Sequence, residues 1–223
     1  MEMESIRTII DIFLTTYPGF LDAAVITLEL TAISVVLGTV LGLVFALMKI
    51  SKSKILQAIA NLYITIIRGT PLLVQIMFLY FGITQIIVLD NFWAGALALG
   101  VHNGAYIAEI FRGAIQGIDH GQTEASRALG MTNGQAMRRI VFPQALRRSI
   151  PPLGNQFIIT LKDSSLVWMI GVAELFSVAN RSAASSFKQF ETFIVVGFYY
   201  LVLVMIFTYI VRWYENRLDV DKT

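Results

Sequence analysis

The sequence predicts an all-α protein that crosses a membrane several times and carries a polar insert between two of its apolar segments. Three observations support this fold class. Of the 223 residues, 56% are hydrophobic and only 14% are charged, and the mean hydropathy of +0.69 is too high for an ordinary water-soluble domain. Apolar runs long enough to span a bilayer recur along the chain, and the segment 119–148 between them is polar.

Composition excludes several classes of function. The formal net charge is only +2, so nucleic acid is not an indicated partner. Cysteine is absent, and the two histidines, His102 and His120, are too few for a metal cluster. The sequence contains neither a Gly-x-x-x-x-Gly-Lys phosphate loop nor a Gly-x-Ser-x-Gly elbow. We therefore expect no catalytic residue, no metal and no cofactor in this chain, and any energy must be consumed by another chain.

The N-terminal residues 1–19 are predicted to form a short helix that lies in the membrane interface. Apolar residues recur there at helical spacing. The segment begins with acids rather than the basic region of a secretory signal, so we expect no cleavage. Pro18-Gly19 is expected to end this helix.

Five spanning helices are expected next, because each crossing needs about 20 mainly apolar residues. We place them at 20–49, 58–85, 92–111, 154–175 and 192–212, all within one transmembrane domain of residues 1–223. Gly69-Thr70-Pro71 removes a backbone donor inside the second span and predicts a kink or an unwound turn. The Ser/Ala-rich segment 177–191 is predicted to be a loop, with or without a short helix.

Basic residues orient these spans, because short cytoplasmic loops carry an excess of Lys and Arg. Three lie on one side, Arg7, Arg181 and Lys188, whereas 12 follow the first, third and fifth spans. The 12 are Lys49, Lys52, Lys54, Arg112, Arg127, Arg138, Arg139, Arg147, Arg148, Arg212, Arg217 and Lys222. The N-terminus is therefore expected outside, and the C-terminus and the segment 119–148 in the cytoplasm.

Polar stripes inside the spans predict a binding site near the bilayer midplane. A charge at the bilayer centre costs about 2.5 kcal/mol or more, so such residues usually face the bundle interior or a pathway. Helical spacing, at about 100° per residue, groups polar residues on one face of the second span and on one face of the fourth. The candidate site residues are Asn61, Thr65, Arg68, Gln75, Gln156, Thr160, Asp163, Ser164 and Ser165.

A structural interpretation of the same charges stays open. Arg68, Glu109, Lys162 and Asp163 would then only neutralise one another and hold helices together. We expect a structural role for Glu109, which has Arg112 near it at the cytoplasmic end, and for Glu29 at the outer end of the first span. His102 is expected to form a hydrogen bond between helices.

The polar insert carries signals for two short helices. Asp119 can cap the first, with Gln122 three residues later, and Gly130 can end it in a left-handed turn. A second capping signature at 132–135 opens another helix that is expected to end before Pro143. Two short helices at an angle would form a compact protrusion that fits a docking groove on another protein. A simple connecting loop would need neither the caps nor the helical periods.

These motifs resemble a known family. Glu124-Ala125-Ser126, Gly130 and the run that ends at Pro143 are similar to the EAA motif of permease subunits of bacterial ABC importers. Ser126 departs from the second Ala of that motif, and Phe142 stands where Leu is common. The segments RGTPLLVQ (68–75), NGAYIAEIFRGAIQGI (103–118), GQTEASRALGM (121–131), PQALRRSIPPLGNQFI (143–158) and LKDSSL (161–166) resemble the histidine/glutamine/arginine permease branch. The likeness runs from the first span to the end of the chain.

The resemblance implies a type I importer fold and a set of partners. Two permease chains, either two copies of this chain or this chain with a sibling, would work with two cytoplasmic ATPases and an external amino-acid-binding protein in a bacterial cytoplasmic membrane. The ATPases would bind ATP-Mg and dock on the coupling helix, which carries Glu124, Ala125, Ser126, Gly130 and Pro143. ATP binding would then drive alternating access around a fixed site.

Within this resemblance we expect Arg68 near the substrate α-carboxylate and Asp163 near a cationic or amino group. Two carboxylates, Asp163 and Glu109, favour a basic amino acid such as arginine, lysine or histidine, and glutamine is the alternative. An ion-driven secondary transporter would be expected to have inverted repeats and paired broken helices, whereas this chain has one interrupted span. A channel or scaffold subunit would not need the polar stripes.

Overall fold

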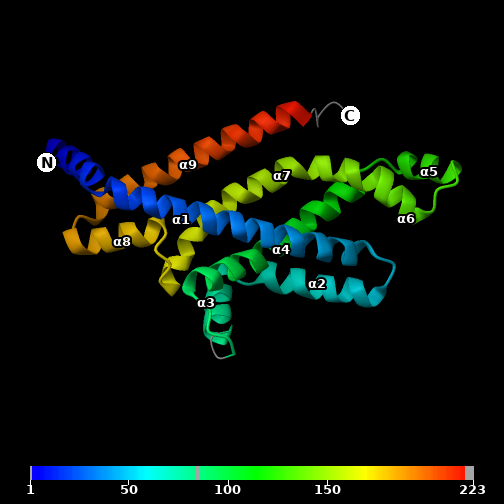
Figure 1. Cartoon of the computed structure of the whole chain (residues 1–223), viewed down its shortest axis with the longest axis horizontal. Helices are drawn as coiled ribbons and strands as arrows, with labels where there is room; N and C mark the ends of the chain where they lie inside the picture. The colour runs from blue at the N-terminus through cyan, green and yellow to red at the C-terminus, as the bar shows by residue number, and fades with distance from the viewer. Residues whose placement is uncertain (1, 84–85, 219–223) are drawn as a thin grey trace.

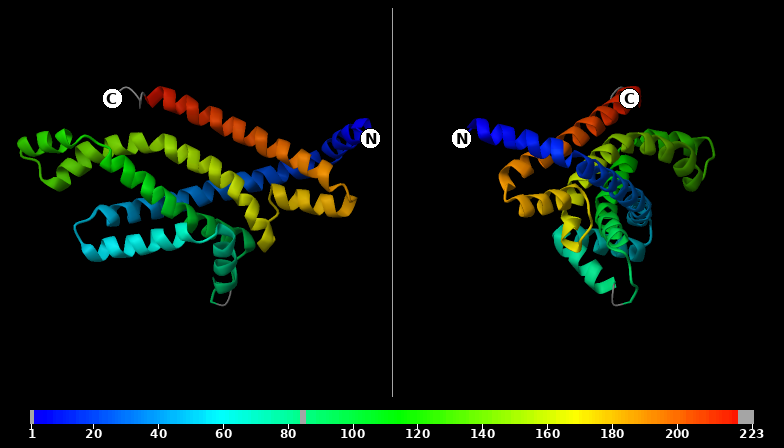
Figure 2. Two further views of the ribbon diagram at one scale, coloured as in Figure 1. Left: turned by 180° about the vertical axis from the view of Figure 1, so that it is seen from behind. Right: turned by 60° about the vertical axis from the view of Figure 1, so that its left-hand side comes forward.

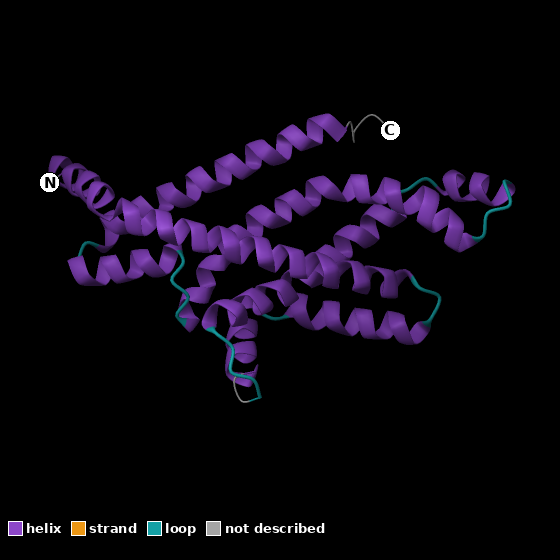
Figure 3. Cartoon of the chain, in the orientation of Figure 1, coloured by secondary structure: helices purple, strands orange, loops and turns teal. Residues whose placement is uncertain are grey.

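A computed structural model describes residues 2–83 and 86–218, and every regular element in them is a helix (Figure 1, Figure 3). The predicted all-α fold is confirmed. In chain order the elements are α1 (Glu2–Ile50), α2 (Lys54–Gly69), α3 (Leu72–Ile83), α4 (Asn91–Gln116), α5 (His120–Ala128), α6 (Asn133–Ala136), the π-helix η1 (Met137–Val141), α7 (Phe142–Asp163), the 3-10 helix η2 (Ser164–Ile170), α8 (Leu175–Ser186) and α9 (Gln189–Leu218).

α1 is one continuous helix of 49 residues, so the prediction that a first helix ends at Pro18-Gly19 is wrong. A proline inside a helix removes one backbone hydrogen bond, but aromatic contacts hold α1 on both sides of Pro18. Phe13 stacks on Tyr199 of α9 with ring centroids 5.6 Å apart, and Phe20 stacks on the same ring at 5.1 Å. This packing outweighs the single lost bond.

α1 and α4 pack closely through glycines on both helices. Gly38 and Gly42 lie one turn apart on α1, and Gly100 and Gly104 lie one turn apart on α4. A Cβ atom at Gly42 would lie only 2.6 Å from the side chain of Ile107. Small residues four positions apart let the backbones of membrane helices approach each other, and here they make α1 and α4 the central pair of the bundle.

α2 and α3 form the second predicted span, but they are not one straight helix. Their axes are bent by 110° at the break between them. Thr70 is extended, with φ −122° and ψ 148°, which is the conformation favoured before a proline, and Pro71 has no N–H to continue the helix. The predicted unwound turn at 69–71 is confirmed. Residues 84–85, at the end of the predicted span 58–85, lie outside the described residues.

α7 begins inside the polar insert and runs into the bundle. The helix predicted to end before Pro143 instead continues, because η1 leads directly into α7 and Pro143 occupies its first turn, where a missing N–H costs little. The fourth predicted span, 154–175, is wrong as a single helix, since α7 ends at Asp163 and η2 follows. Gly171, with φ +85°, then turns the chain in a conformation that favours glycine.

The segment predicted as a loop with or without a short helix contains α8, a helix of 12 residues. Glu174 caps α8: its carboxylate accepts hydrogen bonds from the N–H of Phe176 at 2.8 Å and of Ser177 at 2.7 Å. The same carboxylate accepts a hydrogen bond from the hydroxyl of Tyr200 at 2.9 Å. This fully buried group therefore ties α8 to α9.

The two ends of the molecule carry different elements (Figure 1, Figure 2). The insert with α5 and α6 lies at the same end as the turn between α1 and α2, and the start of α1 and α8 lie at the other end. The basic residues that follow the first and third predicted spans therefore gather at one end of the bundle.

Among the described residues, α1 and α9 are long and apolar enough to cross a membrane, and α2 with α3 could form a third crossing despite the bend. α4 and α7 are also long, with 26 and 22 residues. Polar side chains on both helices form hydrogen bonds to neighbouring helices, and such bonds lower the cost of placing polar groups inside a membrane bundle.

Candidate functional site

The broken turn between α2 and α3 is held together by the side chain of Gln75. Its Nε2 lies 2.7 Å from the carbonyl oxygen of Ile67, 3.0 Å from that of Thr70 and 2.9 Å from the hydroxyl of Thr70. Its Oε1 lies 3.0 Å from Nδ1 of His102 on α4. Gln75, expected as a substrate neighbour, is thus buried and bonded to the backbone groups that the break leaves free. The hydrogen bond expected for His102 is confirmed.

Arg68 stands at the end of α2, next to this turn. Its side chain is exposed, and its guanidinium carbon lies 5.2 Å from the ring centroid of Tyr106 on α4. The part of the chain that the structure describes contains no carboxylate paired with it. Thr65 and Asn61, about one and two turns earlier on α2, are exposed as well. The polar face predicted for this helix is therefore open.

On α7, two of the predicted site residues face inward towards α4. Gln156 Nε2 donates a hydrogen bond to Asn103 Oδ1 at 2.8 Å, and Thr160 Oγ1 lies 2.9 Å from the same oxygen. All three side chains are buried, and Asn103 Nδ2 has no hydrogen-bond partner among the described residues. Asn103 is not among the site residues predicted from the sequence, although a carboxamide in the middle of a spanning segment is itself a signal of polar contact.

Asp163 is the last residue of α7 and is half-buried. Within the described ranges its carboxylate has no ion pair and no side-chain hydrogen bond. The hydroxyl of buried Ser164 donates to the carbonyl of Leu161 at 2.8 Å, while Ser165 is half-buried. α2 and α7 each pack against α4. Arg68 and Asp163 therefore lie on two helices that both pack against α4, and the two side chains form no ion pair with each other.

Glu109 contrasts with both of these groups. Its carboxylate lies 2.6 Å from Nζ of Lys49 at the end of α1, and it accepts hydrogen bonds from Nη2 and Nε of Arg112 at 2.8 and 2.9 Å. Arg112 also donates to Gln116. The structural role expected for Glu109 is confirmed, and Lys49 is the partner that the sequence pattern did not identify.

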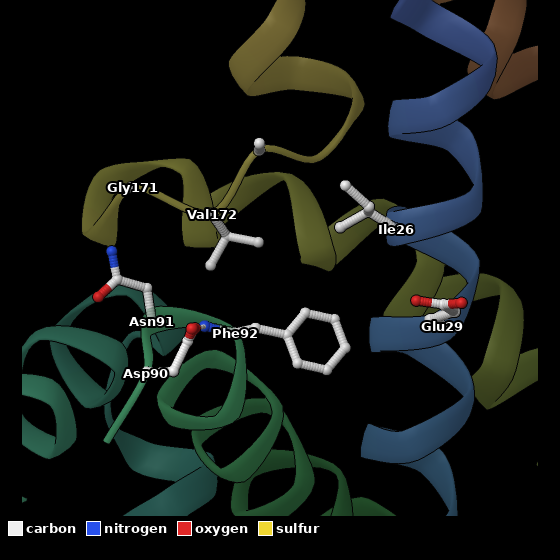
Figure 4. A pocket seen from close by; sticks show the side chains of 8 residues that line it. Ile26, Glu29, Asp90, Asn91, Phe92, Gly171 and Val172 are labelled. Carbon is white, nitrogen blue, oxygen red and sulfur yellow. Dashed lines mark hydrogen bonds between the residues drawn. The ribbon is translucent and has the colours of Figure 1, made fainter. Parts of the chain in front are cut away.

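A pocket of about 460 Å³ opens between α1, the start of α4 and the turn before α8 (Figure 4). Glu29 projects into it from α1, and Asp90 and Asn91 border it from α4. Apolar side chains such as Phe92 line the remainder. No ion pair of Glu29 occurs among the residues that the structure covers, so the structural role expected for this carboxylate stays a prediction.

The polar insert folds as two capped helices. Asp119 caps α5 by accepting a hydrogen bond from the N–H of Gly121 at 2.6 Å. Gly130 has φ +83° and ends the first helix in the predicted left-handed turn. Thr132 and Gln135 form the predicted capping box of α6, with bonds of 2.8 and 3.3 Å.

Most of this insert is exposed, and its corner carries a large apolar side chain. Glu124 and Ala125 are exposed on α5, whereas the hydroxyl of Ser126 is turned inward and donates to the carbonyl of Gln122. Leu129 is 81% exposed beside Gly130. The insert therefore presents exposed residues of α5 and the exposed Leu129 on one protruding, capped helix pair.

A helical bundle with a broken polar span and a protruding helical insert defines a membrane component that binds further proteins. The chain belongs to the family of inner membrane components of binding-protein-dependent transport systems, whose model matches residues 38–220. Members of this family are transport components rather than enzymes.

Relatives confirm the resemblance to amino acid ABC permeases. The chain is 37% identical to the arginine transport system permease protein ArtQ of Bacillus subtilis, with 90% of this chain and 93% of the relative covered. It is also 37% identical to the glutamine transport system permease protein GlnP of Escherichia coli, with 91% and 94% covered. The names of these two relatives state different substrates, although both are equally identical to this chain.

Solved structures agree with the fold. The chain superposes on the crystal structure of an amino acid ABC transporter with histidines with a TM-score of 0.86 at 40% identity, and 92% of this chain and 96% of the other are covered. The MetNI methionine ABC transporter in an inward-facing conformation matches with a TM-score of 0.81 at 20% identity, with 92% and 98% covered, and supports the fold alone.

Proposed function

We propose that this chain is the transmembrane subunit of an ABC importer that moves a polar, basic amino acid across the cytoplasmic membrane by alternating access. The observation that carries the proposal is the guanidinium of Arg68 on the open polar face of α2, which has no carboxylate partner among the residues that the structure describes. An exposed charge inside a spanning helix is stable only where it meets water, another protein surface or a ligand of opposite charge. A substrate α-carboxylate is such a ligand, and arginine binds it with two parallel hydrogen bonds.

Asp163 is the proposed partner for the cationic or amino group of the substrate. It lacks an ion pair among the described residues, whereas Glu109 is already neutralised by two cations. Because Lys49 and Arg112 already neutralise Glu109, that carboxylate no longer argues for a basic substrate. The preference for arginine, lysine or histidine therefore rests on Asp163. Exposed Asn61 and Thr65 are the hydrogen-bonding neighbours on α2.

Glutamine is the second candidate substrate. One free carboxylate is enough to bind the α-amino group that every amino acid carries. Because Glu109 is already paired with Lys49 and Arg112, recognition by a single carboxylate is favoured. The relatives ArtQ and GlnP are equally similar to the chain, so they support arginine and glutamine alike.

A binding-protein-dependent uptake assay in proteoliposomes tests the site and the substrate together. We expect labelled arginine uptake to be inhibited by unlabelled arginine more strongly than by glutamine, and Asp163→Ala to lower both uptake and the stimulation of ATP hydrolysis. Asp11→Ala, which changes an exposed carboxylate near the N-terminus of α1, is the matched control. Intact arginine uptake in Asp163→Ala would show that the site assignment is wrong.

The distribution of basic residues between the two ends of the bundle favours one orientation of the chain in the membrane, and this orientation favours a set of partners. Basic residues gather at the end with the insert, and short cytoplasmic loops are rich in Lys and Arg, which favours a cytoplasmic insert and an external N-terminus. The complex would contain two copies of a separate ATPase, and one copy would dock on α5 and α6 of each permease chain. A second permease chain would cover the open face of α2. An external protein would deliver the amino acid.

Copurification tests the docking surface. We expect the ATPase to be retained by the wild type and lost from Gly130→Val, because a β-branched residue is strained at φ +83° and would displace the exposed corner. Glu215→Gln on α9 is the control. Ion-dependent uptake by the permease alone, without ATP, would instead support a secondary transporter.

A further inference from the structure

The ring of Tyr106 is the contact that the described chain offers to the Arg68 guanidinium. The 5.2 Å between the guanidinium carbon and the ring centroid lies within the range of about 6 Å over which a cation is attracted to an aromatic face. The Arg68 side chain has no hydrogen bond or ion pair within the described residues, and Tyr106 is itself half-buried. The ring thus holds a charged group that no carboxylate in this part of the chain neutralises.

α4 also fixes the backbone next to Arg68. His102 lies one turn before Tyr106 on α4, and its ring centroid is 5.0 Å from that of Tyr106. Through Gln75, His102 is connected to the broken turn that follows Arg68, because the amide of Gln75 bonds to the carbonyl of Thr70 at 3.0 Å. One helix therefore positions both the main chain and the head group of Arg68.

A guanidinium can contact an aromatic ring and a carboxylate at the same time. The group is planar, and its five N–H donors point outward along its edge, where they match a carboxylate with two parallel hydrogen bonds. A ring that covers one face leaves this edge accessible. A free arginine side chain must also lose considerable rotamer freedom when it binds an anion, and a ring that already restricts it reduces this cost.

We propose that Tyr106 is a positioning residue that holds the Arg68 guanidinium ready for the substrate carboxylate. The inference rests on the proposed function, because it takes the ligand of Arg68 to be an amino acid. It assigns Tyr106 a part in substrate affinity that requires no contact between the tyrosine and the substrate.

Equilibrium binding of labelled arginine and of labelled glutamine to the purified permease–ATPase complex, without the binding protein, tests the inference. Tyr106→Leu removes the ring and is expected to weaken binding about tenfold, within the range that a cation–π contact supports. Tyr106→Phe keeps the ring and should stay within about twofold of the wild type. Tyr209→Leu removes an exposed ring on α9 and should leave affinity unchanged. The same amount of ATPase should copurify with every variant.

A double-substitution cycle separates positioning from a merely structural role. Once Arg68→Gln has removed the guanidinium, Tyr106→Leu should cause no further loss, because the ring has no cation to hold. Agmatine, which is arginine without its carboxylate, should compete equally well in the wild type and in Tyr106→Leu.

Several outcomes would overturn the inference, and they differ from a failure of the proposed function. Additive losses in the cycle, unchanged affinity in Tyr106→Leu, or tighter binding in that variant would each remove the positioning role while leaving Arg68 as the substrate contact. If the wild-type complex binds neither arginine nor glutamine, or if Arg68→Gln binds normally, the proposed site itself fails, and the positioning role fails with it.

Discussion

Two groups of charged residues on the inner helices of this protein have opposite surroundings. Glu109 is held between Lys49 and Arg112 by ion pairs of 2.6 and 2.8 Å, which join the end of α1 to α4. Arg68 and Asp163 have no ion pair among the described residues, and Arg68 rests only on the ring of Tyr106. We call the first group the paired cluster and the second the unpaired charges.

The difference shows that pairing, rather than burial, separates structural charges from candidate ligand contacts here. Glu109 and Asp163 are both half-buried, so their exposure alone would not distinguish them. An ion pair that satisfies a carboxylate within the chain leaves it little to gain from a substrate, whereas an unpaired charge gains an opposite charge on binding. Substitutions in the two groups should therefore affect different measurements.

The largest effect is expected from Arg68→Gln. Loss of a charge-assisted, bidentate hydrogen bond to a carboxylate should lower uptake into proteoliposomes by about 100-fold. Thermal unfolding of the purified complex should change little, because within the described residues Arg68 has no ion pair to lose and only its contact with the Tyr106 ring is removed. A marked fall in the unfolding temperature with normal uptake would place Arg68 with the paired cluster.

The next largest effect is expected from Gln75→Leu. This variant keeps every charge but leaves the carbonyls of Ile67 and Thr70 without their side-chain donor, so the turn next to Arg68 should lose its fixed shape. We expect uptake to fall about tenfold and the free energy of unfolding to fall by about 1–2 kcal/mol. Thr70→Val removes the hydroxyl partner of Gln75 together with that hydroxyl's own bond to the carbonyl of Ile66, but it leaves both bonds from Gln75 to backbone carbonyls. It should have a smaller effect on uptake and serves as the control.

Glu109→Ala tests the paired cluster and should have a smaller effect on transport. Lys49 and Arg112 would lose their shared carboxylate, and the free energy of unfolding should fall by about 1–2 kcal/mol because their side chains remain partly hydrated. Uptake should stay within about twofold of the wild type. If uptake is abolished while thermal unfolding is unchanged, Glu109 is a substrate ligand despite its two partners.

The smallest effect is expected from Ser164→Ala. The sequence pattern groups Ser164 with the substrate ligands, but its hydroxyl is buried and donates to the carbonyl of Leu161 in the last turn of α7. Loss of one such bond should cost about 0.5–1 kcal/mol of unfolding free energy. Uptake should be unchanged, and a tenfold loss of arginine uptake would show that this hydroxyl turns towards the substrate.

Much of the local structure could be predicted from the sequence. The caps at Asp119 and Thr132, the left-handed Gly130 and the unwound turn before Pro71 all depend on residues within a few positions of one another. Helix limits that depend on distant contacts could not be predicted. Pro18 does not end α1 because contacts to Tyr199 hold it, and Pro143 does not end its helix because it occupies the first turn of α7.

The all-α class, the polar insert with its two capped helices and the set of polar residues from which a site could be built follow from the sequence alone. Composition, helical period and capping act over one or two turns, so they can be read from neighbouring residues. Which of the polar residues have partners depends on how the helices pack. Gln75, Gln156 and Thr160 are bonded to His102 and Asn103 on α4, whereas Arg68 and Asp163 are unpaired in the described chain. Hydrogen bonds and ion pairs between helices join residues tens of positions apart, and their formation depends on how the helices pack.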